Sequence, residues 1–271
     1  MPELPEVETT LRGIQHHVLH KEIKVVEVRQ PHLRWPVPTE QITKALKGNS
    51  FSEIRRRAKY LILKSQQGSL LIHLGMSGCL RIFPTFIEPK KHDHVDIIFN
   101  DDILLRFTDP RKFGSFLWSE EPDQHPLLKN LGPEPLGNSF SGQHLFELSR
   151  GRKLPIKNFI MNSKIVVGVG NIYANEALFK AGLRPQRRSG KVTLAQFGLL
   201  ASSIKTILQS SIDEGGTTLR DFVGSNNKPG YFKQQLMVYG RKNKKCKSCS
   251  VFLKELRIGQ RSSIYCPKCQ V

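Results

Sequence analysis

Four of the five cysteines in this 271-residue chain lie close to its end, in the pattern Cys246-x2-Cys249-x16-Cys266-x2-Cys269. Two Cys-x2-Cys pairs about 15–20 residues apart are typical of a zinc ribbon, because each pair presents two thiolates to one tetrahedral ion. A pair of disulfides is the weaker alternative inside a cell. Since no ligand position stays open for a metal-bound water, we expect one structural Zn²⁺. The fifth cysteine, Cys79, reads as a small buried or half-buried side chain.

The positive charge of the chain is confined to two segments. Lys and Arg number 42 against 23 Asp and Glu, which gives a formal net charge of +19. Residues 150–191 hold ten basic side chains and one acid, residues 228–271 hold eleven and one, and the rest of the chain is balanced. A solubilising surface would mix both signs, and neither segment is a clean basic amphipathic helix for a membrane surface. The pattern therefore favours nucleic acid as the partner.

The chain shows no membrane span and no signal peptide. Its longest apolar runs fall far short of the roughly 18 residues that a span requires, and its first residues are acidic (Glu3, Glu6 and Glu8) rather than basic and then apolar. We therefore expect a soluble cytoplasmic protein.

The periodicity of apolar residues divides the chain into a strand-rich first half and a helical second half. A helix is expected from about residue 7 to 18, followed by short strands at residues 23–28, 60–64, 70–74, 95–99 and 103–108. Many short strands at close spacing predict an antiparallel sandwich or barrel. Residues 131–142 are rich in Gly and Pro and read as a linker. Beyond it, one helix should follow Gly170, and another should start at Thr193, which forms a capping box with Gln196.

Two further segments suggest chemistry. The glycine turn at residues 167–171 precedes a helix. Tyr173 stands where a dinucleotide-binding fingerprint needs a small residue, which excludes that motif. Two interpretations are left: a helix N-terminus that binds a phosphate, or a plain turn with a capping residue. At the N-terminus, removal of Met1 would leave Pro2 with a free secondary amine that can attack a sugar aldehyde carbon. Glu3 and Glu6 could then move protons. Taken alone, an N-terminal segment rich in Pro and Glu is more often just the first turn of a helix.

Together these segments resemble the bacterial formamidopyrimidine-DNA glycosylase family. The matching segments are residues 2–9 (PELPEVET), 57–61 (RAKYL), 73–78 (HLGMSG), 91–96 (KHDHVD), 108–114 (TDPRKFG), 131–136 (LGPEPL), 166–174 (VVGVGNIYA), 215–222 (GGTTLRDF), 238–241 (VYGR) and 260–262 (QRS), besides the four cysteines. They span the chain in order, which makes the match far more specific than any single motif.

The resemblance implies an α+β multidomain fold. We expect an N-terminal antiparallel β-sandwich catalytic domain at residues 1–132, a helical DNA-binding domain with a helix–two-turn–helix at residues 133–225, and a zinc-finger segment at residues 226–271 with its ribbon at 237–271. Its implied function is that of a bifunctional DNA glycosylase and AP lyase. Such an enzyme excises oxidised purines (8-oxoguanine and formamidopyrimidines) from duplex DNA and cuts the strand by β,δ-elimination in base excision repair. The resemblance also implies a bacterial, nucleoid-associated monomer.

The resemblance assigns a role to each matching residue. Pro2 is implied as the Schiff-base nucleophile and Glu3 as its acid/base partner, with Glu6 as a weaker candidate for a catalytic carboxylate near the sugar. Lys59 is implied in proton transfer during β-elimination, and Arg261 in δ-elimination and phosphate binding. The implied DNA-binding residues are His73, Met76, His92, Arg111, Phe113, Arg152, Lys157, Asn171 and Tyr239, of which Met76, Arg111 and Phe113 fill the void left by the everted nucleotide. Residues 217–231 match the loop that covers the everted base.

Alternatives remain at this point. An endonuclease VIII type of enzyme would prefer oxidised pyrimidines, but its start typically reads Pro-Glu-Gly, unlike Pro2-Glu3-Leu4. A zinc-ribbon binder without activity is the alternative from another class, and nothing in the sequence supports a loss of catalytic residues. One departure from the family pattern is Asn162, where an aspartate is frequent. The amide of Asn162 cannot perform a role that requires a carboxylate.

Overall fold

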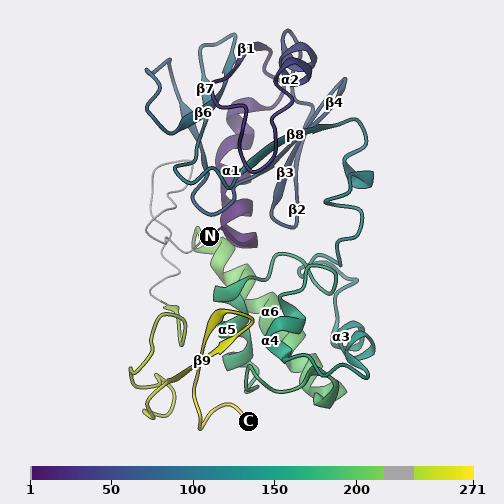
Figure 1. The fold of residues 1–271 in the computed structure, drawn as a ribbon, viewed down its shortest axis with the longest axis vertical. Helices are drawn as coiled ribbons and strands as arrows, with labels where there is room; N and C mark the ends of the chain where they lie inside the picture. The colour runs from purple at the N-terminus through teal and green to yellow at the C-terminus, as the bar shows by residue number, and fades with distance from the viewer. Residues whose placement is uncertain (1, 217–234) are drawn as a thin grey trace. The chain divides into compact units, whose positions relative to one another are not determined.

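The computed structural model describes residues 2–216 and 235–271 (Figure 1). Within these ranges the chain forms two compact units, residues 2–129 with 214–216, and residues 130–213 with 235–271. None of the described helices is both long and apolar enough to cross a bilayer.

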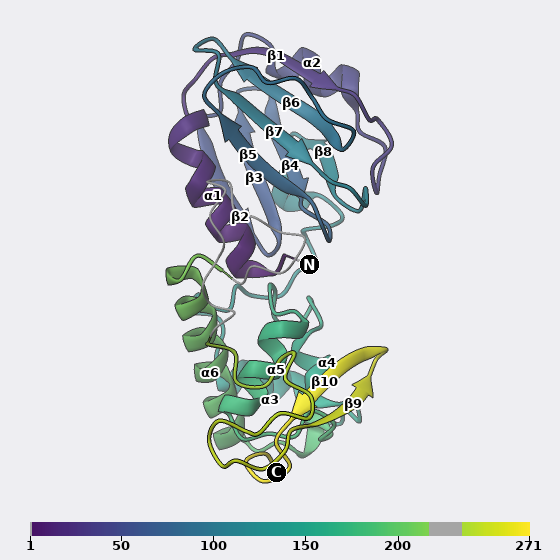
Figure 2. The same ribbon diagram turned by 90° about the vertical axis from the view of Figure 1, so that its left-hand side faces the viewer.

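The first unit is an antiparallel β-sandwich with one long helix packed beside it (Figure 2). One sheet has the strand order β1-β6-β7-β5 and the other β2-β3-β4-β8, and every neighbouring pair is antiparallel. Their bounds are β1 Ile23–Val28, β2 Glu53–Arg57, β3 Tyr60–Ser65, β4 Gly68–His73, β5 Cys79–Phe83, β6 Asp93–Phe99, β7 Leu104–Thr108 and β8 Ser115–Ser119. The unit also holds the helices α1 Leu4–Val18 and α2 Thr39–Leu46 and the 3-10 turn η1 Pro122–Gln124.

The core of this unit lies between the two sheets. Side chains from both inner faces, such as Leu63 on β3 and Phe107 on β7, pack into one cluster with Leu11 and Ile14 of α1. Burial of these alternating apolar residues fixes which face of each strand points inward. The expected N-terminal sandwich is thus confirmed.

Helix α1 begins three residues earlier than its apolar periodicity predicts. Glu3 occupies the N-cap, forms a capping box with Glu6, and is followed by Pro5 in the first turn. A capping box satisfies two backbone N–H groups that the helix leaves without partners, and proline fits the first turn because it has no N–H to lose. The first turn therefore becomes helical and draws the N-terminus of the chain onto the sandwich.

The second unit contains helices and a zinc ribbon. Its helices are α3 Gly142–Ser149, α4 Ile156–Ile160, α5 Asn171–Lys180 and α6 Leu194–Asp213, with the 3-10 turn η2 Ser189–Lys191. The predicted capping box of α6 is confirmed, because Gln196 N donates to Thr193 Oγ1 and Thr193 N donates to Gln196 Oε1. The strands β9 Lys254–Ile258 and β10 Arg261–Tyr265 form a two-stranded hairpin between the two cysteine pairs.

Candidate active site and DNA-binding residues

The N-terminal turn of α1 holds two buried carboxyl groups beside Pro2. Glu3 and Glu6 are each 2% exposed, and Pro2 is buried as well. Glu3 N donates to Glu6 Oε2 at 2.8 Å, while the Glu3 carboxylate accepts from the backbone N–H of Glu6. Glu6 is thereby engaged in holding the residue that follows Pro2. The local sequence thus fixes an acid next to a potential N-terminal amine.

A salt bridge connects this helix to the turn between β2 and β3. Arg56 Nε lies 2.8 Å from Glu8 Oε2, and Arg56 also donates through Nη1 to Ala58 O at 3.1 Å. Ala58 has a φ of 56°, which closes the two-residue turn that it forms with Lys59. Since α1 also packs against β2 and β3, this salt bridge attaches the second turn of α1 to the strand that leads into the turn of Lys59.

His73 lies beside this turn and is held in its neutral form. It pairs with Tyr60 across β3 and β4, and the two ring centroids are 4.8 Å apart. Gly75 N donates to His73 Nδ1 at 3.0 Å, so that nitrogen is an acceptor and carries no proton. Burial, and then the positive charges of Lys59 and Arg34, lower the pKa of His73 to about 4.

Two turns of the sandwich are fastened together by Asp109, which is fully buried. Its Oδ1 accepts from Ser77 Oγ at 2.6 Å and its Oδ2 from Gly114 N at 2.8 Å. Gly75 has a φ of +65°, and a Cβ there would lie 2.4 Å from Phe113 C. Turn 74–78 and turn 109–114 are therefore in direct contact, which only glycine at position 75 permits.

These contacts bring the three expected void-filling side chains together. Met76 is part of turn 74–78, and both Arg111 and Phe113 are part of turn 109–114. Phe113 is 43% exposed, so it is no core residue, and the Arg111 guanidinium lies 4.9 Å from the centre of its ring. His92 lies next to turn 109–114, because its backbone carbonyl accepts a hydrogen bond from Asp109 N at 3.0 Å.

The remaining expected contact residues and Arg261 lie in the second unit. Arg152 is exposed, with its guanidinium 5.8 Å from the centre of the Phe159 ring. Asn171 is the first residue of α5, and its Oδ1 is buried without a hydrogen bond in the described part of the chain. Arg261 is exposed at the start of β10. Lys157, in contrast, is fully buried.

Tyr239 is held through its backbone by a residue that the sequence did not single out. Glu176 of α5 is 4% exposed and accepts three backbone N–H groups, from Met237 at 2.9 Å, Val238 at 2.9 Å and Tyr239 at 2.8 Å. The sequence could have pointed to Glu176, because it is the one acid in residues 150–191 and a carboxylate inside an apolar helix needs hydrogen-bond partners. Glu176 anchors the segment that leads into the ribbon.

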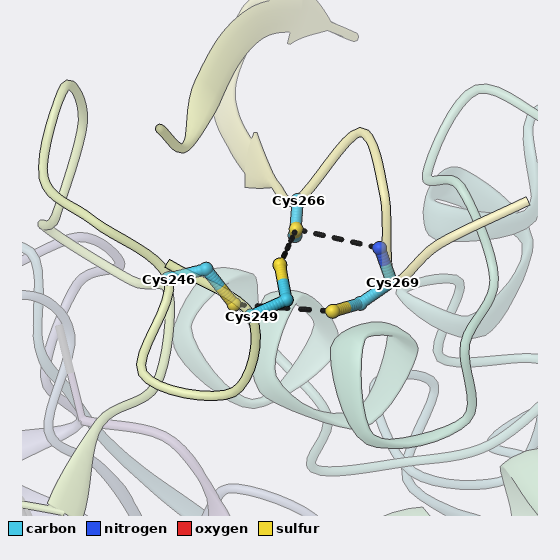
Figure 3. Close-up of side chains that lie close together, drawn as sticks. All are labelled: Cys246, Cys249, Cys266 and Cys269. Atoms are coloured by element: carbon cyan, nitrogen blue, oxygen red, sulfur yellow. Dashed lines mark hydrogen bonds between the residues drawn. The ribbon is translucent and has the colours of Figure 1, made fainter. Parts of the chain in front are cut away.

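The four cysteines form a metal site of the predicted kind (Figure 3). Their Sγ atoms all lie within 4.8 Å of one another, with 3.4 Å between Cys249 and Cys266 and 4.0 Å between Cys246 and Cys269. Zn–S bonds of about 2.3 Å place tetrahedral sulfur ligands about 3.8 Å apart, so one zinc ion fits among them. Four thiolates complete the coordination, which makes the site structural.

Sequence reasoning also missed Arg34 and Asp109. Arg34 belongs to the loop between β1 and α2, and its backbone N donates to Gly114 O at 3.1 Å. No local pattern marks it, since the contact joins residues 80 positions apart. Asp109 stood inside a matched segment without a role. The expected loop at residues 217–231 lies outside the described residues.

Asn162, the departure from the family pattern, makes a local hydrogen bond. Its Oδ1 accepts from Lys164 N at 3.0 Å. An amide oxygen performs this task as well as a carboxylate oxygen, because either can accept from a backbone N–H in such a turn. The substitution therefore keeps the turn that leads from α4 toward the glycine segment.

Comparison with known protein families identifies three domains in the chain. Three family models match: the formamidopyrimidine-DNA glycosylase N-terminal domain at residues 1–116, the H2TH domain of the same glycosylases at residues 131–223, and the zinc finger found in FPG and IleRS at residues 243–271.

Curated relatives and solved structures match over the full length. The formamidopyrimidine-DNA glycosylases of Stutzerimonas stutzeri and Pseudomonas aeruginosa are each 53% identical over 270 residues, covering 100% of both chains. A complex of Lactococcus lactis Fpg with DNA containing an abasic site superposes with a TM-score of 0.91 at 33% identity, covering 99% of each chain. The same values hold for MutM in complex with DNA containing carbocyclic 8-oxo-G. This chain belongs to the formamidopyrimidine-DNA glycosylase family.

Proposed function

We propose that the protein is a bifunctional DNA glycosylase and AP lyase of base excision repair. It excises 8-oxoguanine and formamidopyrimidines from duplex DNA and then cuts the strand. The observation that carries the proposal is the buried carboxyl group of Glu3, fixed beside Pro2 by the capping box and joined through Glu8 and Arg56 to the turn of Lys59. Related structures contain DNA with Fapy-dG, an abasic site or carbocyclic 8-oxo-G, which supports the same substrate class.

Pro2 is the nucleophile in this mechanism. After Met1 has been removed, the lone pair of the Pro2 nitrogen attacks C1′ of the damaged nucleotide, and the bond from C1′ to the base breaks with its electron pair leaving on the base. Glu3 takes the proton that the amine loses and gives it to O4′ as the bond from C1′ to O4′ breaks and the sugar ring opens, while the departing base takes a proton from water. The product is an iminium between Pro2 and C1′.

Strand cleavage follows from the acidity of this iminium. Lys59 takes a proton from C2′, and the bond from C3′ to the phosphate oxygen breaks, which is β-elimination. A second elimination removes the proton from C4′ and breaks the bond from C5′ to its phosphate oxygen, with Arg261 supporting the departing phosphate. Hydrolysis of the iminium then returns Pro2 to its free amine.

Access to C1′ requires that the damaged nucleotide leave the base stack. Met76, Arg111 and Phe113 fill the space it leaves: Phe113 wedges between bases, Met76 is an adaptable apolar filler, and Arg111 bonds to the orphaned partner base. The exposure of Phe113 supports this role, since burying 43% of an aromatic side chain against bases is favourable.

Phosphate contacts hold the duplex. We assign them to His73, His92, Arg152, Asn171 and Tyr239, with Glu176 fixing the backbone of Tyr239. His73 contributes as a neutral donor through Nε2, because its Nδ1 is the acceptor of the Gly75 N–H. One zinc ion keeps the ribbon folded and takes no part in the chemistry.

Borohydride trapping tests this function directly. Mass spectrometry first identifies the protein that has lost Met1, which is then mixed with duplex DNA containing 8-oxoguanine, with thymine glycol as the oxidised-pyrimidine arm. We expect a covalent adduct on 8-oxoguanine DNA, at least tenfold less with Pro2→Gly, and none with protein that keeps Met1. Pro5→Ala is the matched control and should trap normally. Absence of an adduct from processed protein would leave only a DNA binder, and faster reaction with thymine glycol would favour the pyrimidine-specific alternative.

A further inference from the structure

Lys157 of α4 occupies an environment unlike that of a DNA-contacting lysine. Its relative exposure is 0%, and its Nζ donates to Ser262 O at 2.6 Å and to Ser263 Oγ at 2.7 Å. A phosphate on bound DNA approaches from solvent, and a fully buried ammonium group cannot meet it without a rearrangement. A buried charge is retained only where acceptors compensate for its lost hydration. Ser262 and Ser263 both belong to β10.

The same helix touches the turn of the β9–β10 hairpin at a second point. Gly259 and Gln260 form a two-residue turn with φ values of +53° and +61°, as a tight type I′ hairpin requires. A Cβ on Gly259 would lie 2.8 Å from Asn158 Nδ2, so α4 and the turn are in close contact. Figure 2 shows the hairpin beside α4 and α5.

Arg261 lies between these two points of attachment. It directly follows the Gly259–Gln260 turn and directly precedes Ser262, whose carbonyl binds Lys157. Further along β10, Ile264 N donates to Asn175 Oδ1 at 2.8 Å. The backbone of Arg261 is thus held on both sides, while its side chain is exposed. A guanidinium that must meet a phosphate within a fraction of an ångström gains from such fixed attachment.

We propose that Lys157 is a positioning residue, which fixes the β9–β10 turn and through it Arg261, and that it makes no contact with DNA phosphate. This inference rests on the proposed function for the role of Arg261, and it replaces the phosphate contact that the sequence implies for Lys157. The ammonium group acts on the reaction by holding the strand that carries Arg261.

The test separates positioning from phosphate binding with Lys157→Met and Ser263→Ala. The first variant keeps the length of the side chain and removes its charge, and the second removes one acceptor and keeps the lysine. Lys153→Met is the matched control, because Lys153 is exposed on the same segment. All variants are used as full-length, zinc-loaded protein on duplex DNA containing an abasic site.

Positioning predicts three results. The ratio of δ- to β-elimination product falls about tenfold in Lys157→Met and less in Ser263→Ala, while the rate of borohydride trapping changes less than about threefold. The slope of the logarithm of the DNA-binding constant against the logarithm of the salt concentration is the same in the variants as in the wild-type protein. Amide exchange of residues 259–263 becomes faster in both variants. Lys153→Met leaves the product ratio and this exchange as they are.

Two results would overturn the inference. One is a salt slope reduced by about 0.9 in Lys157→Met with an unchanged product ratio, which is the signature of a lost phosphate contact. The other is an equal loss of trapping and of both elimination products, which is the signature of general unfolding. If the unchanged protein forms no adduct, the proposed function fails. The exchange experiment then still decides whether Lys157 holds the turn.

Discussion

Replacing Glu176 by glutamine should weaken the second unit substantially. The Glu176 carboxylate accepts three backbone N–H groups at 2.8–2.9 Å, two on Oε1 and one on Oε2. A glutamine that keeps its oxygen toward Val238 and Tyr239 turns its NH₂ group toward the N–H of Met237, so two donors face each other. One buried donor loses its partner, at a cost of about 1–3 kcal/mol.

The two hydrogen bonds that remain also become weaker. Bonds to an ionised acceptor are roughly twice as strong as neutral ones, so the loss of charge removes about 0.5–1 kcal/mol from each. Together with the orphaned N–H group, we expect a decrease of about 3 kcal/mol in the free energy that protects residues 237–239 from opening. Val238 is fully buried in one cluster with Cys246 and Cys266, so the same change should lower the affinity of the protein for zinc.

Native-state amide exchange of the zinc-loaded protein measures this free energy locally, and a competing chelator measures the zinc affinity. Glu147→Gln is the matched control, because Glu147 is an exposed acid on α3 whose carboxylate accepts a hydrogen bond from the side chain of Gln143. A loss below about 0.5 kcal/mol at residues 237–239 in Glu176→Gln, with zinc affinity unchanged, would refute the argument that the carboxylate anchors this segment.

Three further changes have outcomes that the structure specifies. Removal of zinc by a chelator should abolish DNA binding and expose the amides of β9 and β10, while the thermal unfolding of the sandwich stays the same. Because the pKa of His73 is lowered to about 4 from 6.5, the folded state binds fewer protons between these values. Stability should therefore fall as the pH drops from about 6.5 to 4, by less than about 3 kcal/mol. Urea unfolding of His73→Gln across this range should show a flatter profile. Gly75→Ala should lower the unfolding free energy of the first unit by about 2–4 kcal/mol, because its Cβ meets the Phe113 backbone at 2.4 Å. Gly48→Ala has a similar φ with nothing within 4 Å and should cost about 1 kcal/mol or less.

Local patterns were sufficient for much of this protein. The spacing of the cysteines predicted a zinc site, and their four sulfur atoms indeed lie together. Each Cys-x2-Cys pair presents two thiolates to the same ion, so the local spacing is sufficient to identify the ligands. The Thr193 capping box and the strand-rich first half were likewise confirmed, since caps and periodicity act over a few residues. The edges of elements were less predictable: α1 starts at Leu4 because Glu3 and Glu6 cap it, whereas apolar periodicity begins at Val7.

The sequence by itself determined the family, the sandwich, the metal ligands and the set of candidate residues, because these depend on residue identity and short-range spacing. Tertiary structure alone decided what several charged groups do. Lys157 is buried against residues of β10 that lie more than 100 positions away, and Glu176 binds a segment about 60 positions away. Burial, and then the charges of Lys59 and Arg34, lower the pKa of His73 and keep it neutral. Protonation state and accessibility depend on the groups that folding brings within a few ångströms. In one basic segment, Arg152 is therefore exposed to solvent while Lys157, five residues along, is buried against a strand.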